Sequence, residues 1–192
     1  MELPKLEKYN MITVISSTNR KDSNSTKIAQ YYYNILKDNT LEEVKLLDLY
    51  DIPLAWYEND ILKKDSQHLE LRLIQEEFMI PADKFVFIIP EYNGGFPGVL
   101  KLFIDACSVY MMTETFKIGT KKAMLVGISS GRAGNIRGLD QFAGILNYLN
   151  ISVMPNLLPI SSVHKLFDNE SNLTDEATLK VVKAQIDDFL KY

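Results

Sequence analysis

A strand, a glycine-rich loop and a helix follow one another between residues 84 and 106, and this unit constrains the fold more than any other part of the chain. Residues 84–89 (KFVFII) form a continuous apolar run, which is typical of a strand covered on both faces of a parallel sheet. The loop that follows, PEYNGGFPG, holds three glycines, which allow positive φ angles and close backbone approach. Pro97 stands where the first turn of a helix tolerates proline. We therefore expect this loop to present backbone N–H groups to a flat ligand.

The rest of the chain alternates short apolar runs with helical patterns. The expected strands are residues 11–16, 44–49, 84–89, 123–128 and 151–154. The expected helices are residues 25–37, 66–79, 97–112, 136–149 and 174–190. Repeated βα units with short connections imply a parallel sheet with helices on both faces, because crossovers between parallel strands are right-handed in about 98% of cases. The sequence thus predicts an α/β three-layer sandwich forming one domain over residues 1–192, with a five-stranded parallel sheet of order 2-1-3-4-5.

Composition excludes several classes of function. Lys and Arg number 21 and Asp and Glu 25, so the net charge of −4 and the scattered basic residues disfavour a nucleic-acid surface. Cys107 is the single cysteine, which rules out an internal disulfide, and the start MELPKLEKYN lacks the pattern of a signal peptide. No apolar run approaches the roughly 20 residues that cross a bilayer. We expect a soluble, cytoplasmic protein that binds neither nucleic acid nor membrane.

Three loops are expected to meet at one edge of this sheet. A doubly wound sheet binds its ligand beyond the carboxyl ends of its strands, where the winding reverses, which for this order lies between the first and third strands. The loops concerned are residues 16–26 (first loop), 90–98 (second loop) and 129–135 (third loop). Of the nine glycines in the chain, five lie in the second and third loops and none precedes Gly94. Glycine is placed where backbone has to approach a ligand closely.

The first loop lacks glycine and carries hydroxyl side chains and Arg20 ahead of a helix. A helix N-terminus offers unpaired N–H groups and the positive end of the helix dipole, and a nearby arginine adds a charge-assisted contact. This pattern predicts a cup for a single phosphate. It matches neither GxxxxGK[ST] nor GxGxxG, so it argues against ATP hydrolysis and Rossmann-type NAD binding. The alternative is that these serines only cap the helix.

The segment PEYNGGFPGVLKLFIDA resembles, almost position for position, the PEYN-G-x-PG-x-LK-x-x-ID segment of the NADPH-dependent FMN reductases. That family has a flavodoxin-like fold and includes quinone, azo-dye and chromate reductases. The first loop is similar to the family's GS-x-R-x-x-S-x-N pattern, from which it departs at Ser17, in place of glycine, and at Ser25, in place of asparagine. DLYDIPLAWYEND also resembles the family's DLYDLPLYD run, which lies near the flavin and the partner subunit.

The resemblance implies how FMN would be held. The residues expected at its phosphate are Ser17, Thr18, Arg20, Ser23 and Ser25. Those expected along the ribityl chain and the ring, with the Asn93 amide at the polar edge, are Pro90, Glu91, Tyr92, Asn93 and Gly94. Those expected at the pyrimidine end are Ser129, Gly131 and Arg132. Glu91 is alternatively expected to reach the neighbouring subunit.

The implied function is an FMN-dependent NAD(P)H oxidoreductase. FMN would take hydride from NADPH or NADH and reduce a small acceptor: a quinone, an azo or nitro compound, a metal oxyanion or free flavin. Because the flavin supplies this chemistry, we assign no catalytic side chain. The alternatives are a flavodoxin-type electron carrier and a non-catalytic flavin- or nucleotide-binding sensor. The resemblance also implies a homodimer or homotetramer, with the Trp56 loop and the helix after Gly98 as candidate contacts.

A few other residues have simpler interpretations. His68 and His164, the two histidines, lack a nearby partner at zinc-ligand spacing, so we expect no metal site. Cys107 falls on the apolar face of its helix and is expected to be a small core residue. For Trp56 and Tyr57, a place near the flavin or subunit contact and a place at the margin of the core both stay open.

Overall fold

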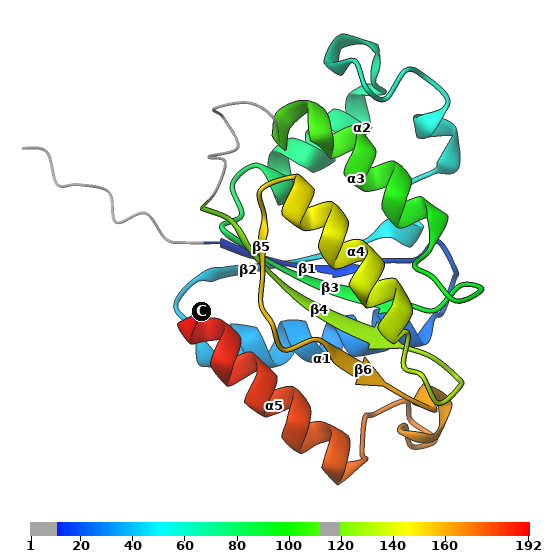
Figure 1. The fold of residues 1–192 in the computed structure, drawn as a ribbon, viewed down its shortest axis with the longest axis vertical. Coiled ribbons are helices and arrows are strands. Elements are labelled where there is room, and N and C mark those ends of the chain that lie inside the picture. Colours follow the sequence, from blue (N-terminus) through cyan, green and yellow to red (C-terminus); the bar gives the residue numbers. More distant parts are fainter. Residues whose placement is uncertain (1–10, 112–119) are drawn as a thin grey trace, which may run out of the picture.

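One parallel sheet organises residues 11–111 and 120–192, the part of the chain that this computed structural model describes. Its strands are β1 (Met11–Ser16), β2 (Glu43–Asp48), β3 (Lys84–Pro90), β4 (Lys122–Ile128), β5 (Ser152–Val153) and β6 (Leu158–Ile160). The strand order is β2-β1-β3-β4-β5, and every described pair is parallel (Figure 1). The predicted order 2-1-3-4-5 is confirmed. Residues 1–10 of the predicted domain and Met112 of a predicted helix lie outside the described residues.

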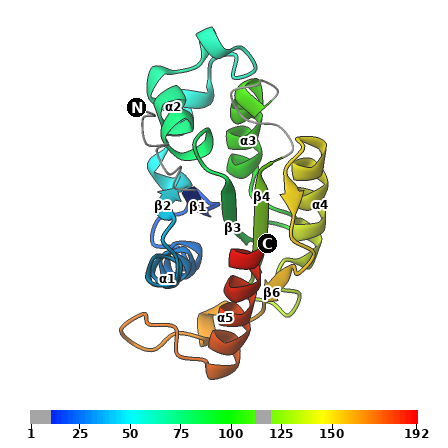
Figure 2. The same ribbon diagram turned by 90° about the vertical axis from the view of Figure 1, so that its left-hand side faces the viewer.

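Helices cover both faces of the sheet, as the predicted three-layer sandwich requires. The helices are α1 (Asn24–Asn39), α2 (Leu69–Ile74), α3 (Gly98–Met111), α4 (Ile136–Tyr148) and α5 (Glu176–Lys191). Helices α1 and α5 lie on one face, and α2, α3 and α4 lie on the other (Figures 1 and 2). Two clusters of buried side chains correspond to the two faces. None of the helices in the described ranges is long and apolar enough to span a membrane.

Strand β3 shows why the continuous apolar run was informative. Phe85 and Phe87 contribute to the core under α3 and α4, whereas Val86 and Ile88 contribute to the core against α1 and α5. Successive side chains of a strand point to opposite faces, so a central strand between two helical layers needs apolar residues at every position. Phe87 meets Phe142 of α4 edge to face, with ring centroids 5.0 Å apart.

The fifth position of the sheet departs from the prediction, because two short strands occupy it. The strand expected over residues 151–154 ends early, and the chain returns to β4 as β6 after a short excursion that begins at Pro155. Proline has no N–H to give to the ladder. In the gap, the buried Gln185 side chain of α5 donates to the carbonyls of Asn156 (2.9 Å) and Leu125 (3.4 Å). A side chain thus partly replaces the missing strand pairing.

The predicted helix over residues 66–79 is shorter and less regular than expected. The backbone at Gln67 is extended, and the Gln67 side chain donates to the carbonyls of Ile61 (2.6 Å) and Ala106 (2.8 Å). Helix α2 therefore begins only after this residue and passes into a π-helical turn at Gln75–Met79. Short 3₁₀ turns are found at Leu49–Asp51, Leu54–Tyr57, Lys64–Ser66 and Val163–Lys165.

Candidate functional site

A cavity of about 210 Å³ opens at the carboxyl ends of β1, β3 and β4, where the three loops meet. This is the edge of the sheet at which the strand order predicted a ligand site. The residues that line the cavity are Thr18, Arg20, Lys21, Asp22, Ser23, Asn24, Ser25, Pro90, Glu91, Tyr92, Ile128, Ser129, Ser130 and Val163.

The N-terminus of α1 forms one wall of the cavity. Ser23 caps the helix, and its Oγ accepts the Thr26 N–H at 3.1 Å. The first turn contains no acidic residue. The first N–H groups of a helix lack partners within the helix and carry the positive end of its dipole. Because Asn24 and Ser25 of this turn line the cavity, the wall is suited to an anion.

A carboxylate beneath the same wall orients its hydroxyl groups. Thr26 Oγ1 donates to Asp48 Oδ2 at 2.7 Å. A hydroxyl has one proton, so the Ser23 and Ser16 hydroxyls, 3.0 and 3.3 Å from Thr26 Oγ1, must act as its donors. Their protons therefore point away from the cavity in this arrangement. The donors left for an anion include the backbone N–H groups of α1, the cations Arg20 and Lys21, and other hydroxyls that line the cavity, such as that of Thr18.

The first and second loops are joined by a side-chain hydrogen bond. The Thr18 hydroxyl lies 2.6 Å from the Tyr92 hydroxyl, and Thr18 Oγ1 also accepts the Arg20 N–H at 3.2 Å. Thr18 is buried and Tyr92 is half-buried, and both line the cavity. The two loops are held at a defined separation across the cavity.

The second loop reverses direction through a tight turn. Tyr92 N–H donates to the Gly95 carbonyl at 2.9 Å, and Gly95 N–H donates to the Tyr92 carbonyl at 3.1 Å. Asn93 and Gly94 between them have φ angles of 52° and 83°. This left-handed backbone favours glycine and asparagine. The positive φ expected of glycine in this loop is found at Gly94.

The third loop is held by its own serine and by the chain after β6. Ser129 Oγ donates to the Gly131 carbonyl and accepts the Gly134 N–H, both at 3.0 Å. Val163 N–H donates to the Ser129 carbonyl at 3.0 Å, which brings the turn after β6 to the cavity. Arg132 is exposed and does not line the cavity.

The structure brings together most of the site residues expected from the sequence. Eight of the thirteen line the cavity, namely Thr18, Arg20, Ser23, Ser25, Pro90, Glu91, Tyr92 and Ser129. The other five lie in the same loops without lining it, namely Ser17, Asn93, Gly94, Gly131 and Arg132. The Ser17 hydroxyl is fully buried and donates to the Ile15 carbonyl, so it does not present a contact to an anion as expected. Sequence reasoning missed Lys21, Asp22, Asn24, Ile128, Ser130 and Val163, of which only Val163 lies outside the predicted strands and loops.

The residues given simpler interpretations are placed as follows. Cys107 is buried in the core, as expected, and burial raises the pKa of its thiol. Tyr57 is also a core residue, whereas Trp56 is half-buried and stacks on His68 with ring centroids 4.8 Å apart. His68 Nδ1 accepts the Glu70 N–H and caps α2. Within the described residues, no group of three or more His, Cys, Asp and Glu side chains could hold a metal ion.

Comparison with known proteins decides the family. A family model described as NADPH-dependent FMN reductase matches residues 11–165. The chain belongs to the NADPH-dependent FMN reductase family. This confirms the relationship indicated by the second loop.

Individual proteins similar to this member of the FMN reductase family have names that are consistent with the assignment. An FMN-dependent NADH:quinone oxidoreductase of Alteromonas mediterranea is 24% identical over 181 residues, covering 86% of this chain and 89% of that protein. A 2-hydroxy-1,4-benzoquinone reductase of a Burkholderia species is 26% identical over 180 residues, covering 93% of each. The structure of a flavoenzyme NAD(P)H:(acceptor) oxidoreductase of Paracoccus denitrificans superposes with a TM-score of 0.77 at 24% identity, covering 95% of this chain and 96% of that one. The flavodoxin-like fold is therefore confirmed.

The cavity of this family member has groups that suit the phosphate of FMN. The α1 wall and Arg20 suit a phosphate group, and the hydroxyls of Thr18 and Tyr92 lie beside it. The second loop provides backbone next to the cavity at Pro90 and Glu91. The residues present thus fit a phosphorylated flavin, and no step of the fit needs a metal.

Proposed function

We propose that this protein is an FMN-dependent NAD(P)H oxidoreductase that reduces a small acceptor. Its family and the names of its relatives support this function. The observation in the structure that carries the proposal is the convergence of the first, second and third loops on one cavity whose wall is the N-terminus of α1. A quinone is the acceptor that we place first, because several relatives are named for quinone substrates.

The placement of the three loops around the cavity supports a role for each of them in binding the flavin. We propose that the α1 N–H groups, Arg20 and Thr18 hold the phosphate, while Ser23 and Ser25 shape the wall. Pro90, Glu91, Tyr92, Asn93 and Gly94 lie along the ribityl chain and the ring, and Ser129, Gly131 and Arg132 lie at its pyrimidine end. Ser17 supports the first loop from beneath through its bonds to the strands.

Bound FMN would supply the hydride and electron transfer in this protein. The contribution of the chain is to bind the flavin, to orient it and to leave one side open to NAD(P)H and the acceptor. No side chain is needed as acid, base or nucleophile. Buried Cys107, which lies in the α3 core, has no part in this function.

A carrier or a sensor would bind FMN without turnover, and one experiment separates these functions. The purified protein is mixed with FMN, free ligand is removed, and the visible spectrum is recorded under nitrogen before and after addition of NADPH or NADH. The expected result is a retained yellow colour that bleaches with at least one nicotinamide. Bound FMN that stays oxidised with both would favour the carrier or the sensor, and absence of binding would overturn the site itself.

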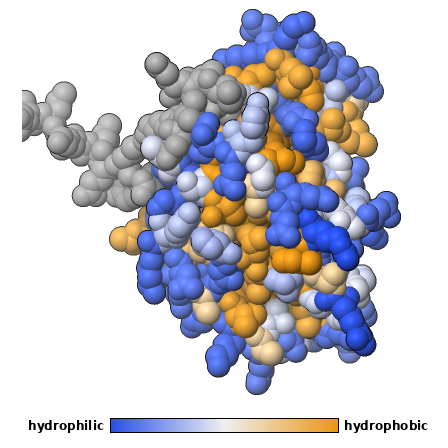
Figure 3. Space-filling view, viewed as in Figure 1, coloured by the Kyte–Doolittle hydropathy of each residue, from blue (hydrophilic) through white to orange (hydrophobic). Residues whose placement is uncertain are grey.

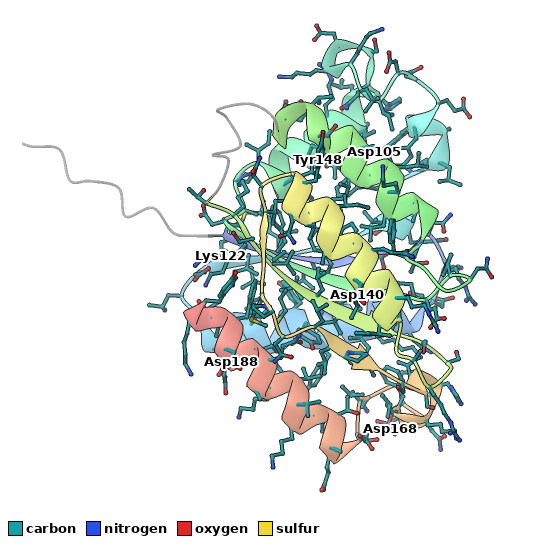
Figure 4. All side chains as sticks on the ribbon, in the orientation of Figure 1. Asp105, Lys122, Asp140, Tyr148, Asp168 and Asp188 are labelled. Carbon is teal, nitrogen blue, oxygen red and sulfur yellow. The ribbon has the colours of Figure 1, made fainter. Side chains whose placement is uncertain are left out.

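We also propose that the protein is a cytoplasmic homodimer, in which α3 and α4 form the subunit contact. A groove of about 390 Å³ between these helices is lined by the ion-paired Lys101 and Asp105, by Ile145 and by the exposed Tyr148 (Figure 4). Hydrophobic surface extends along this face between more polar regions (Figure 3). Sedimentation analysis of the protein and of Tyr148→Glu tests this: a dimer that the substitution converts to monomer is expected, and a monomeric unmodified protein would refute it.

A further inference from the structure

The Asn135 side chain bridges the third loop to the end of β3. Asn135 stands at the start of α4 with φ 64° and ψ 29°, but its side chain does not cap that helix. Its Nδ2 instead donates to the carbonyls of Ile89 and Pro90, both at 3.0 Å. The residue is 1% exposed. This amide therefore contacts the last carbonyls of the strand that leads into the second loop.

The orientation of this amide is fixed by its partners. Two carbonyl oxygens face Nδ2, and turning the amide over would bring Oδ1 against both of them. Oδ1 consequently lies buried without a hydrogen-bond partner. A buried acceptor without a partner costs stability, so its presence needs a compensating gain. The two bonds of Nδ2 are that gain.

Gly138 makes the space for this amide. A Cβ added at Gly138 would lie 2.3 Å from Asn135 Oδ1 and 2.7 Å from Nδ2, closer than such atoms approach. Gly144, on the same helix, would meet no atom within 4 Å. Glycine is unfavourable inside a helix, so Gly138 needs a packing reason, and the Asn135 side chain supplies it.

The bridge acts on the wall of the cavity. Pro90 and Glu91 line the cavity, and Glu91 N–H donates to the Ile128 carbonyl at 2.9 Å. The Asn135 side chain thus holds the Ile89 and Pro90 carbonyls, while the Ile128 carbonyl holds the Glu91 N–H. Of the two carbonyls bonded to Nδ2, that of Pro90 belongs to a residue that lines the cavity. While it is bonded to Nδ2, it is not free to turn toward the cavity, where its negative end would oppose added negative charge on a ligand.

We propose that Asn135 is a positioning residue for the flavin-binding segment of the second loop, and that Gly138 is required for its placement. This inference rests on the proposed function and extends it to residues that do not line the cavity. Asn135 fixes the start of the second loop, so it contributes to FMN affinity and keeps the Pro90 carbonyl from turning into the cavity.

The requirement of the Asn135 side chain for glycine at position 138 is tested in the ligand-free protein with Asn135→Gly, Gly138→Ala and the double variant. Asn135→Gly removes the amide and permits the same positive φ. Gly138→Ala is expected to lower the melting temperature in the original background and to raise it in the Asn135→Gly background, where the clash is absent. Gly144→Ala should raise it in both, because alanine favours helix. Equal effects of Gly138→Ala in the two backgrounds would overturn the placement argument.

The positioning role is tested by amide exchange and by flavin binding. In ligand-free Asn135→Gly, exchange of the Glu91 N–H should be about tenfold faster, as expected for loss of roughly one hydrogen bond. FMN affinity should fall about tenfold, and the midpoint potential of bound FMN should become more negative because the freed Pro90 carbonyl disfavours the added charge. Ile186→Val, which destabilises the opposite core, should leave the potential unchanged.

Two results distinguish failure of this inference from failure of the proposed function. If the unmodified protein does not bind FMN, the proposed function fails, and with it the flavin role of Asn135, whatever the exchange shows. If the unmodified protein binds FMN but Asn135→Gly leaves the affinity within about twofold and the potential unchanged, the positioning role fails and the function stands.

Discussion

The Thr18 and Tyr92 hydroxyls lie 2.6 Å apart, and their hydrogen bond joins the two loops that face each other across the cavity. Tyr92→Phe removes this bond and keeps the ring. We expect FMN affinity to fall about fivefold, which corresponds to about 1 kcal/mol for a typical hydrogen bond. Fluorescence titration with FMN measures it. Tyr33→Phe on α1 is the control and should bind as the unmodified protein does; equal affinities for all three would contradict a role for this contact.

Arg20 and Arg132 are predicted to act at opposite ends of the flavin. Arg20 lines the cavity beside the α1 wall, so Arg20→Gln should weaken FMN binding tenfold or more, because a charge-assisted hydrogen bond contributes about 1.5–3 kcal/mol. Riboflavin, which has no phosphate, should bind Arg20→Gln within about twofold of the unmodified protein. Arg132→Gln should change the affinities for FMN and riboflavin by the same factor. A loss of riboflavin binding in Arg20→Gln would place Arg20 at the ring instead.

Gln185 is predicted to be the most costly polar residue to replace in α5. It donates to the Asn156 and Leu125 carbonyls and accepts the Tyr32 hydroxyl at 2.9 Å. Gln185→Leu keeps an apolar stem but leaves these groups without partners, so the free energy of unfolding should fall by about 3 kcal/mol. Urea unfolding measures it. Gln30→Leu, at an exposed position of α1, is the control, and a loss below about 1 kcal/mol in Gln185→Leu would refute the bridging role.

Cys107 is predicted to be unreactive in the folded protein. It is 1% exposed and burial raises its pKa, so little thiolate forms at neutral pH. A thiol reagent such as dithionitrobenzoate should release no chromophore from the native protein within minutes and one equivalent after addition of urea. Cys107→Ala should give no signal in either condition. Rapid modification of native protein would show that the α3 core opens readily.

Asp175 is predicted to stabilise the folded protein to an extent that depends on pH. Hydrogen bonds from the Thr178 side chain and backbone N–H lower the pKa of this carboxyl, which caps α5. A lowered folded-state pKa adds stability that is complete above about pH 4 and is lost as the pH falls through the folded value. Asp175→Ala should therefore lower the melting temperature at pH 7 and have a smaller effect near pH 2.5. An effect that grows with acid would contradict this sign.

Much of the fold could be predicted because apolar runs and helix periods are local signals. Strands β1, β3 and β4 are covered on both faces, and their sequences are predominantly apolar. The split of the fifth position could not be predicted, because β6 is three residues long and contains a proline. The break between β5 and β6 is bridged by the side chain of Gln185, which bonds the Asn156 carbonyl from 29 residues further along the chain, and no local pattern indicates that contact.

The candidate site was predictable to the level of loops and not of individual contacts. Thr18, Arg20 and Tyr92 were found by motif, and the cavity brings them together. The burial of the Ser17 hydroxyl was not predicted, because whether a serine faces its own strand or the ligand depends on the turn that follows it. The bond from Thr26 to Asp48 joins residues 22 positions apart in sequence, and no local pattern indicates it.

The divided fifth position also affects how the sheet ends. An edge strand normally exposes a row of unpaired N–H and C=O groups on which a strand of another molecule can assemble. Here that row is broken into β5 and β6 by a segment that contains Pro155, and Pro159 within β6 has no N–H to donate. A second chain cannot extend the sheet from this side in continuous register. Resistance to edge-to-edge aggregation is thus built into the same segment that carries the chain back to the cavity at Val163.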